Sequence, residues 1–188
     1  MHKVALGAVV MAFSMLAAPV AYAQMKVTSD DISEGAVSKK DMEANVFGCK
    51  GDNISPSLKW TGAPDGTKSF AINLYDPDAP TGSGFWHWVV FNIPVSTTSL
   101  PKDAGDVKKK LMPKGAIQAR NDYGFWGYGG MCPPEDKSTH HYKLTVYAVD
   151  EDKLQFAKDK TVPAPVVGFE LHFHSKAKAE LNWTFSRP

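Results

Sequence analysis

The sequence predicts a mainly β fold, an antiparallel β-sandwich with a few short helices at its periphery. Several segments alternate apolar and polar side chains with a period of two, which is typical of strands with one buried face. Loops rich in Gly, Pro, Asp and Asn separate these segments, and patterns with the helical period are sparse. Two packed sheets would bury the apolar faces of such strands.

Length and composition limit the domain organisation and the class of function. The chain has 188 residues, 43% of them hydrophobic, with 21 basic and 20 acidic side chains. This balanced charge argues against a nucleic-acid-binding protein, and the hydrophobic content argues against intrinsic disorder. The sequence contains no linker and no repeat, so residues 24–188 are expected to form a single domain.

Residues 1–23 have the pattern of a secretory signal peptide. A head that carries Lys3 is followed by an apolar segment over residues 4–16 and by a small-x-small sequence that ends at Ala23. A membrane anchor is the alternative, but a Gly and a Ser interrupt the apolar segment and no charge cluster follows it. We therefore predict cleavage after Ala23 and a periplasmic or secreted protein that does not span a membrane.

The chain has two cysteines, Cys49 and Cys132. An exported compartment permits disulfides, and the even number of cysteines favours a bridge over a reactive thiol beside a histidine. A bridge between them would close a loop of more than 80 residues. In the chain-entropy model, a loop of that length stabilises the fold by about 4 to 5 kcal/mol. We therefore predict a disulfide between these two residues.

Two predicted strands bring titratable side chains onto apolar faces. Residues 69–76 alternate so that Asp76 shares a face with three apolar side chains, an unusual place for a carboxylate. Residues 142–149 also alternate, and extending their pattern backwards places His140 inward and His141 outward. The two neighbouring histidines are therefore expected to lie in different environments.

Two further strands and the short helices complete the predicted domain. Residues 177–185 read as an amphipathic strand, and residues 85–91 are nearly all apolar, as in a strand that is covered on both faces. Weak helical signals occur at four places, residues 38–43, 103–111, 151–157 and 165–174.

Candidate functional residues occur in three parts of the chain. The Asp-Pro-Asp-Ala-Pro sequence at residues 76–80 fixes two carboxylates in a rigid turn, and His87 follows in an apolar strand. Residues 127–134 form a Gly-rich loop able to point backbone N–H groups at an anion. Each feature alone has a structural explanation, namely turn formation for the Asp-Pro sequence and a hydrogen-bonded core residue for His87. Their combination with His140 indicates a site.

Together these motifs resemble the phosphatidylethanolamine-binding proteins, also called Raf kinase inhibitor-like proteins. The matching motifs follow the same order as in that family and lie at residues 76–80, 86–88, 128–134 and 140–142. Residues 49–56 are similar to the bacterial YbhB/YbcL branch in particular. The resemblance covers about residues 27–187 and implies a central antiparallel sheet packed on a smaller one.

The resemblance also implies a small pocket for phosphate or a phosphorylated group such as phosphoethanolamine. It assigns eight residues to this pocket, which are Asp76, Asp78, Pro80, His87, Gly129, Gly130, His140 and Tyr142. Residues 174–181 are similar to a family segment that is expected at the C-terminal rim of the pocket.

Two roles are open for the acidic residues of such a pocket. The two histidines and the loop N–H groups would hold the phosphate, and Asp76 or Asp78 would either receive an ammonium group or orient an imidazole. If either histidine must be charged, anion affinity would fall as the pH rises past about 6 to 7.

An enzymatic role is the weaker alternative. Asp and His can perform acid–base chemistry or bind Zn²⁺, but the sequence has no nucleophile-elbow Ser and no His-Glu-x-x-His motif. We therefore predict a non-enzymatic protein with neither a cofactor nor a metal site. The His-Phe-His sequence at residues 172–174 would place both imidazoles on one strand face, either as a metal-scavenging pair or as a pH-sensitive surface pair.

The other alternative is a protein-interaction or inhibitor module in which the pocket is vestigial. The resemblance implies such partners for some relatives, and it implies a homodimer for the bacterial ones. Four aromatic residues near the C-terminus are candidates for the interface, although core packing is the commoner fate of such residues: Phe169, Phe173, Trp183 and Phe185.

Overall fold

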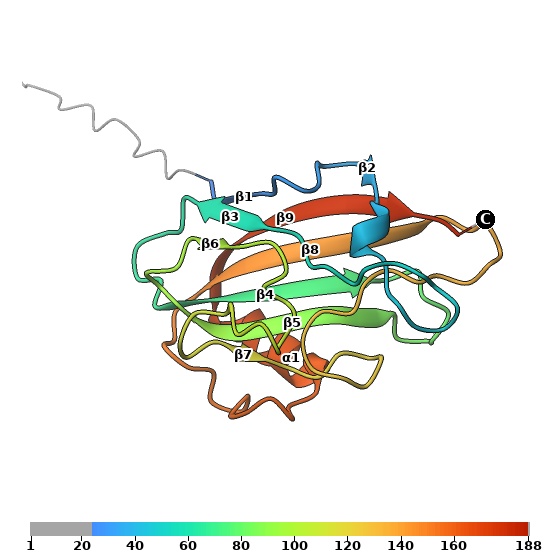
Figure 1. Cartoon of the computed structure of the whole chain (residues 1–188). Coiled ribbons are helices and arrows are strands. Elements are labelled where there is room, and N and C mark those ends of the chain that lie inside the picture. Colours follow the sequence, from blue (N-terminus) through green and yellow to red (C-terminus); the bar gives the residue numbers. More distant parts are fainter. Residues whose placement is uncertain (1–23, 188) are drawn as a thin grey trace, which may run out of the picture.

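The structure is a computed structural model that describes residues 24–187. Two sheets form this part of the chain, as Figure 1 shows. In order across it, the larger sheet contains β2 (Ala36–Val37), β9 (Ser175–Phe185), β8 (His140–Val149), β4 (Ser69–Asp76), β5 (Phe85–Pro94) and β7 (Ile117–Gln118). The smaller sheet contains β1 (Lys26–Thr28), β3 (Leu58–Thr61) and β6 (Ser99–Leu100). The predicted mainly β fold is confirmed, whereas the predicted signal peptide lies outside the described residues.

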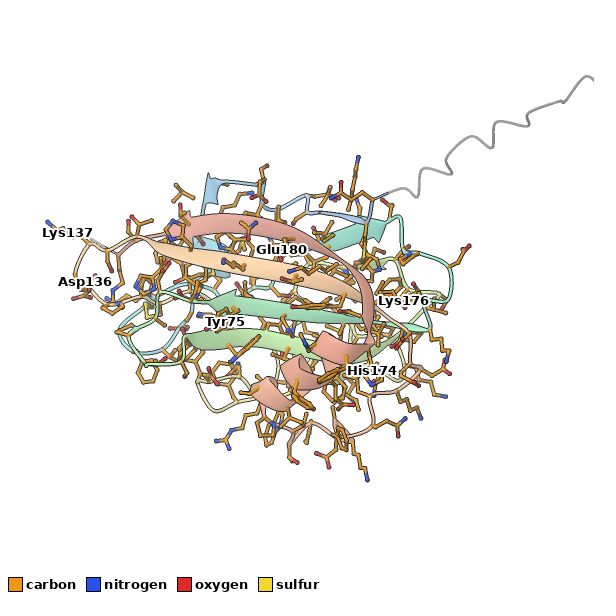
Figure 2. All side chains as sticks on the ribbon, turned by 180° about the vertical axis from the view of Figure 1, so that it is seen from behind. Tyr75, Asp136, Lys137, His174, Lys176 and Glu180 are labelled. Carbon is orange, nitrogen blue, oxygen red and sulfur yellow. A yellow bond between two sulfur atoms is a disulfide. The ribbon has the colours of Figure 1, made fainter. Side chains whose placement is uncertain are left out.

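The central strands β4 and β5 are covered on both faces. Trp88 and Val90 of β5 belong to a core cluster that extends to the smaller sheet, and Val89 and Phe91 belong to a second cluster under α1 (Ala164–His174). Figure 2, seen from behind, shows α1 in front of these strands. Because β5 is buried on both faces, its sequence is a continuous apolar run rather than an alternation of apolar and polar residues.

Strands β8 and β9 keep the alternation that the sequence predicts. His140 is buried and His141 is exposed, so the two neighbouring histidines lie on opposite faces. In β9 the small and apolar residues point to the core, and Lys178 and Glu180 point to solvent. Trp183 is 1% exposed and therefore belongs to the core, so its proposed place in a dimer interface was wrong.

Three of the four predicted helical segments form no α-helix. Residues 38–43 contain one turn of 3₁₀ helix, η1 (Lys40–Met42), and residues 103–111 and 151–157 form turns. The Glu170 carboxylate explains the last case, because it accepts hydrogen bonds from the backbone N–H groups of residues 155–157 and replaces the helical partners. None of the helices described in the structure is long and apolar enough to cross a membrane.

The segment that joins α1 to β9 corrects two further predictions. His172 and His174 lie in the helix rather than in a strand, and residues two positions apart in a helix point to nearly opposite sides. Ser175 pairs with Val149 and Phe185 pairs with His140, so residues 174–181 begin at the end of the sheet remote from His140. They do not form the rim of a pocket at that histidine.

The sheet topology brings the candidate site residues to one edge. Strand β4 ends at Asp76, which pairs with Phe85 at the start of β5. Strand β8 is antiparallel to β4 and begins at His140, and Tyr75 of β4 pairs with Lys143 of β8, so the start of β8 lies beside the end of β4. Segments distant in the sequence therefore meet at the same end of the larger sheet.

Candidate functional site

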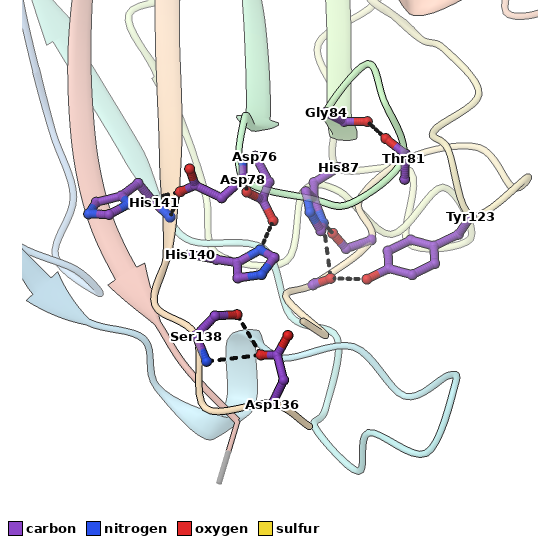
Figure 3. A network of polar contacts seen from close by, with 12 residues as sticks. Asp76, Asp78, Thr81, Gly84, His87, Tyr123, Asp136, Ser138, His140 and His141 are labelled. Carbon is purple, nitrogen blue, oxygen red and sulfur yellow. Dashed lines mark hydrogen bonds and ion pairs between the residues drawn. The ribbon is translucent and has the colours of Figure 1, made fainter. Parts of the chain in front are cut away.

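A cavity of about 290 Å³ opens at this edge of the sheet. Five of the eight predicted site residues line it, namely Asp76, Pro80, His87, His140 and Tyr142. Four of these residues are almost fully buried, and we call them the floor of the cavity: Asp76, His87, His140 and Tyr142. Aromatic and proline side chains are frequent among the other lining residues. Figure 3 shows the polar network around the floor.

The Asp76 carboxylate is fully engaged within the fold. One oxygen lies 2.7 Å from Nδ1 of His140, and both side chains are 3% exposed. The other oxygen accepts the backbone N–H of Asp78 at 2.9 Å. A carboxylate held in this way orients the imidazole and supplies a counter-charge for it. Of the two roles that the sequence left open, the geometry favours the orienting one.

His87 is held by two carbonyl groups. Its Nδ1 lies 2.8 Å from the carbonyl oxygen of Gly129 and 3.0 Å from that of Gly130, so Nδ1 carries the proton and donates it. The rings of Phe85 and Tyr142 lie against the imidazole, which is 2% exposed. This burial lowers the pKa of His87 to about 4, although the two carbonyls and Asp76 oppose the effect. His87 is therefore neutral at neutral pH.

The glycine loop does not offer its N–H groups to the cavity. The N–H of Gly129 donates to the backbone oxygen of His87 at 2.8 Å, and the N–H of Gly130 donates to Oδ1 of Asn53, also at 2.8 Å. Our prediction that these groups bind an anion was wrong, because both are already paired. The glycines serve close packing instead, since a Cβ on Gly130 would lie 2.2 Å from the backbone oxygen of Met42.

Tyr142 places a phenol at the floor of the cavity. Its Oη is buried and makes no hydrogen bond within the described part of the chain. Burial raises the pKa of this phenol, and the nearby Asp76 carboxylate raises it further, so the group stays protonated. An unpaired buried hydroxyl is costly, so an acceptor oxygen that reached this phenol from the cavity would lower that cost.

Asp78 lies outside the cavity. Its Oδ2 accepts two hydrogen bonds from His141, one from the backbone N–H and one from Nδ1, both at 2.8 Å. The imidazole hydrogen bond is the main reason why the pKa of Asp78 is below its usual range. Asp78 therefore fixes the turn after β4, and it is not among the residues that line the cavity.

The predicted disulfide between Cys49 and Cys132 is formed, and it brings an arginine to the cavity wall. Nη1 of Arg187 lies 2.9 Å from Sγ of Cys49 and 3.1 Å from Sγ of Cys132, and Nη2 donates to Glu135. The Arg187 side chain is 18% exposed and its Nε has no partner among the described residues. Sequence reasoning missed this residue, because no motif marks an arginine just beyond the last strand.

The mouth of the cavity is aromatic. Tyr123 stands between Phe47 and Phe85, with ring centroids 5.7 Å and 4.6 Å away, and all three line the cavity. Tyr123 also donates to the carbonyl oxygen of Gly130 at 2.8 Å, which ties the mouth to the His87 network. Phe47 is 76% exposed, so part of this apolar wall faces solvent. Neither Phe47 nor Tyr123 lies among the eight residues that the resemblance assigned to the pocket.

Comparisons with known proteins agree with this architecture. A family model described as phosphatidylethanolamine-binding protein matches residues 29–186. The UPF0098 protein YbcL of Escherichia coli is 46% identical over 159 residues, which cover 85% of this chain and 86% of YbcL. The UPF0098 protein YbhB of the same organism is 45% identical over 162 residues, which cover 86% of this chain and all of YbhB.

The similarity extends to solved structures. The crystal structure of Escherichia coli YbcL, described as a new member of the mammalian PEBP family, has a TM-score of 0.85 and 44% sequence identity. The match covers 88% of this chain and 100% of that one.

A more distant relative by sequence is the putative lipoprotein LppC of Mycobacterium tuberculosis. It is 37% identical over 101 residues, which cover 54% of this chain and 46% of LppC.

Proposed function

Because the chain belongs to the phosphatidylethanolamine-binding protein family, we propose that it is an exported, non-enzymatic protein that binds a small phosphorylated group in this cavity. The single observation that carries the proposal is the floor of the cavity, where two fixed imidazoles and an unpaired phenol converge. The ligand we propose is phosphate or a phosphate monoester such as phosphoethanolamine.

The donors and acceptors of the floor define the form of the ligand. His87 and His140 each use Nδ1 within the fold, and neither Nε2 has a partner in the described residues. In a neutral imidazole this nitrogen accepts a hydrogen bond, so it complements a P–OH group rather than a bare oxyanion. Tyr142 donates to a second ligand oxygen, and Arg187 supplies positive charge at the wall. A monoprotonated phosphate offers both kinds of partner.

The state of His87 limits the expected pH dependence. With a pKa of about 4, this residue cannot supply positive charge near neutral pH. A fall of affinity between pH 6 and 7 would therefore not report on a change in the charge of His87.

The cavity supports binding better than catalysis. Its hydroxyl groups are poor nucleophiles, because Thr81 donates its proton to the carbonyl of Gly84 and burial raises the pKa of Tyr142. Both cysteines are joined in the disulfide and are not available as thiolates. These features favour a non-enzymatic role.

Export is supported by independent features. The N-terminal sequence has the pattern of a cleaved signal, and the disulfide is a bond that persists in oxidising compartments. The lipoprotein name of one relative is consistent with an exported family member. We infer a periplasmic or secreted location.

The test is a titration of the ¹⁵N-labelled protein with phosphate, phosphoethanolamine and acetate, followed by amide chemical shifts. We expect saturable shifts around residues 76–87 and 140–142 with the two phosphates and weaker ones with acetate. Tyr142→Phe and His140→Gln should each weaken phosphate binding. His141→Gln is the matched control, because it removes the neighbouring imidazole, which lies outside the cavity.

Several results would contradict the proposal. They are shifts confined to another surface, equal binding of acetate and phosphate, or an affinity that His141→Gln lowers as much as His140→Gln does. Hydrolysis of the phosphate monoester during the titration would contradict the non-enzymatic part alone.

The second candidate is a protein-interaction module, and exposed aromatic residues favour it. Phe169 and Phe173 of α1 are 58% and 64% exposed, and their rings stack edge to face at 5.0 Å. They remain the candidates for the homodimer interface. Sedimentation of the Phe169→Ser/Phe173→Ser variant beside the unmodified protein tests this, since a dimer through α1 would dissociate.

A further inference from the structure

We propose that Asp150, Glu151 and His174 form a binding site for a divalent transition-metal ion such as Zn²⁺. The three residues lie where β8 ends and where α1 meets β9, at the end of the larger sheet remote from the cavity. In Figure 2, His174 and the loop residues Asp136 and Lys137, which precede β8, lie at opposite ends of the molecule. The proposed metal site is therefore separate from the ligand cavity and does not depend on the proposed function.

The three potential ligand atoms lie close to one another in space. One potential donor atom from each of the three residues lies within 4.8 Å of the others. Nδ1 of His174 is 3.1 Å from Oδ1 of Asp150. With metal–ligand bonds of about 2.1 Å, this separation gives an angle of roughly 95° at the ion, which a distorted tetrahedral Zn²⁺ site accommodates.

Backbone contacts hold the three residues in place without a metal. The N–H of Asp150 donates to the backbone oxygen of His174 at 3.0 Å, which fixes the two chain segments side by side. The hydroxyl of Ser69 donates to the backbone oxygen of Glu151 at 2.6 Å, which ties the third residue to β4. Little backbone ordering is then needed on binding, and this favours affinity.

The local charge favours a cation. Two carboxylates face one imidazole, and His174 is the last residue of α1, where the helix dipole is negative. The side chains of His174 and Asp150 are 33% and 43% exposed, so water can complete the coordination.

The donor set selects the kind of ion. One imidazole nitrogen with two carboxylate oxygens suits Zn²⁺ and other first-row transition metals, whereas Ca²⁺ and Mg²⁺ prefer oxygen ligands alone. The proposed site therefore differs from the His172 and His174 pair that the sequence suggested. His174 is still a metal ligand, but the other two ligands are the acidic residues that follow β8 and not His172.

The test is a titration of the chelator-treated protein with ZnCl₂, in which amide cross-peaks identify the site and calorimetry gives the affinity. We expect saturable shifts at residues 150, 151 and 174. His174→Ala should weaken this binding by about tenfold or more, because even outer-shell changes cost that much. His172→Ala is the matched control, since it removes an exposed imidazole of the same helix that has no place in the cluster.

Further variants and ions make the outcome decisive. Glu151→Gln should weaken Zn²⁺ binding without changing the folded spectrum, and an unchanged affinity would reduce the site to an ordinary Asp–His ion pair. Equal losses in His172→Ala and His174→Ala would mean unspecific surface binding and would overturn the proposal. Binding of Ca²⁺ as tightly as Zn²⁺ would exclude the imidazole as a ligand. Zinc-induced shifts confined to the cavity residues would also overturn it.

Discussion

Two consecutive histidines, each paired with an aspartate, lie in very different surroundings in this protein. Nδ1 of His140 lies 2.7 Å from Asp76 with both side chains 3% exposed. Nδ1 of His141 lies 2.8 Å from Asp78, but these side chains are 60% and 40% exposed. The contact distances are nearly equal, so burial is what separates the two pairs.

The comparison shows which of the two pairs can act as a site. Water screens the His141–Asp78 pair and can replace either partner, so this pair contributes little beyond shaping a turn. The His140–Asp76 pair is desolvated, and both of its residues line the cavity. The alternation of β8 produces this difference, because successive residues of a strand point to opposite faces.

Asp76→Ala is expected to have the largest effect. It leaves the Nδ1–H group of His140 buried without an acceptor, so the free energy of unfolding should fall by about 3 to 5 kcal/mol. Urea denaturation followed by tryptophan fluorescence measures this. Asp76→Asn is the control, because it retains one acceptor oxygen and should cost less. A loss below about 1 kcal/mol for Asp76→Ala would show that burial does not distinguish the pairs.

The next largest effect on stability is expected for His87, the buried imidazole that has no carboxylate partner. Burial lowers the pKa of His87 from 6.5 to about 4, so between these pH values the unfolded chain binds a proton that the folded protein does not. The free energy of unfolding should therefore fall by on the order of 3 kcal/mol as the pH drops from 6.5 to 4, and this contribution is fully present above pH 6.5.

His87→Gln isolates that contribution, because Gln can still donate to the loop carbonyls but does not titrate. Denaturation curves of both proteins at several pH values give the difference. The unmodified protein should lose more stability than the variant over this range. Parallel pH profiles for the two proteins would mean that His87 titrates normally in the fold.

The sequence predicted the fold best where one face of a strand meets water. The alternation in β8 and β9 survives in the structure because their outer faces are solvated, and this placed His140 and His141 correctly. The segment at residues 151–157 was mispredicted because its N–H groups bind Glu170, a partner remote in sequence. Local helical propensity contains no information about such a partner.

The site was predictable for residues in motifs and not for residues placed by long-range packing. Asp76, His87 and His140 lie in recognisable motifs, and the topology brings them together. Arg187 reaches the cavity beside a disulfide whose cysteines are 83 residues apart, which no local pattern records. The direction of the Gly130 N–H likewise depends on Asn53, which is 77 residues away in the chain.

Arg187 gives an intermediate test, because its ion pair with Glu135 joins a mostly buried partner to an exposed one. Their side chains are 18% and 66% exposed. Arg187→Gln should weaken phosphate affinity by roughly tenfold, which corresponds to about 1.4 kcal/mol. Glu135→Gln should leave the affinity unchanged or strengthen it slightly, since it removes a competitor for the guanidinium. Calorimetric titration measures both, and equal weakening would assign the pair a purely structural role.

The smallest effect is expected for the exposed pair. Asp78→Ala should lower the free energy of unfolding by less than about 1 kcal/mol, and moderate salt should reduce that difference further. The hydrogen bond from the His141 imidazole is the main reason that the pKa of Asp78 lies below its usual value of 3.8. Its contribution is therefore present above that value and disappears as the pH falls through the lowered pKa. Urea denaturation of this variant beside Asp76→Ala at pH 7 tests the comparison directly, because two equal losses would mean that the contact distance, rather than burial, sets the strength of each pair.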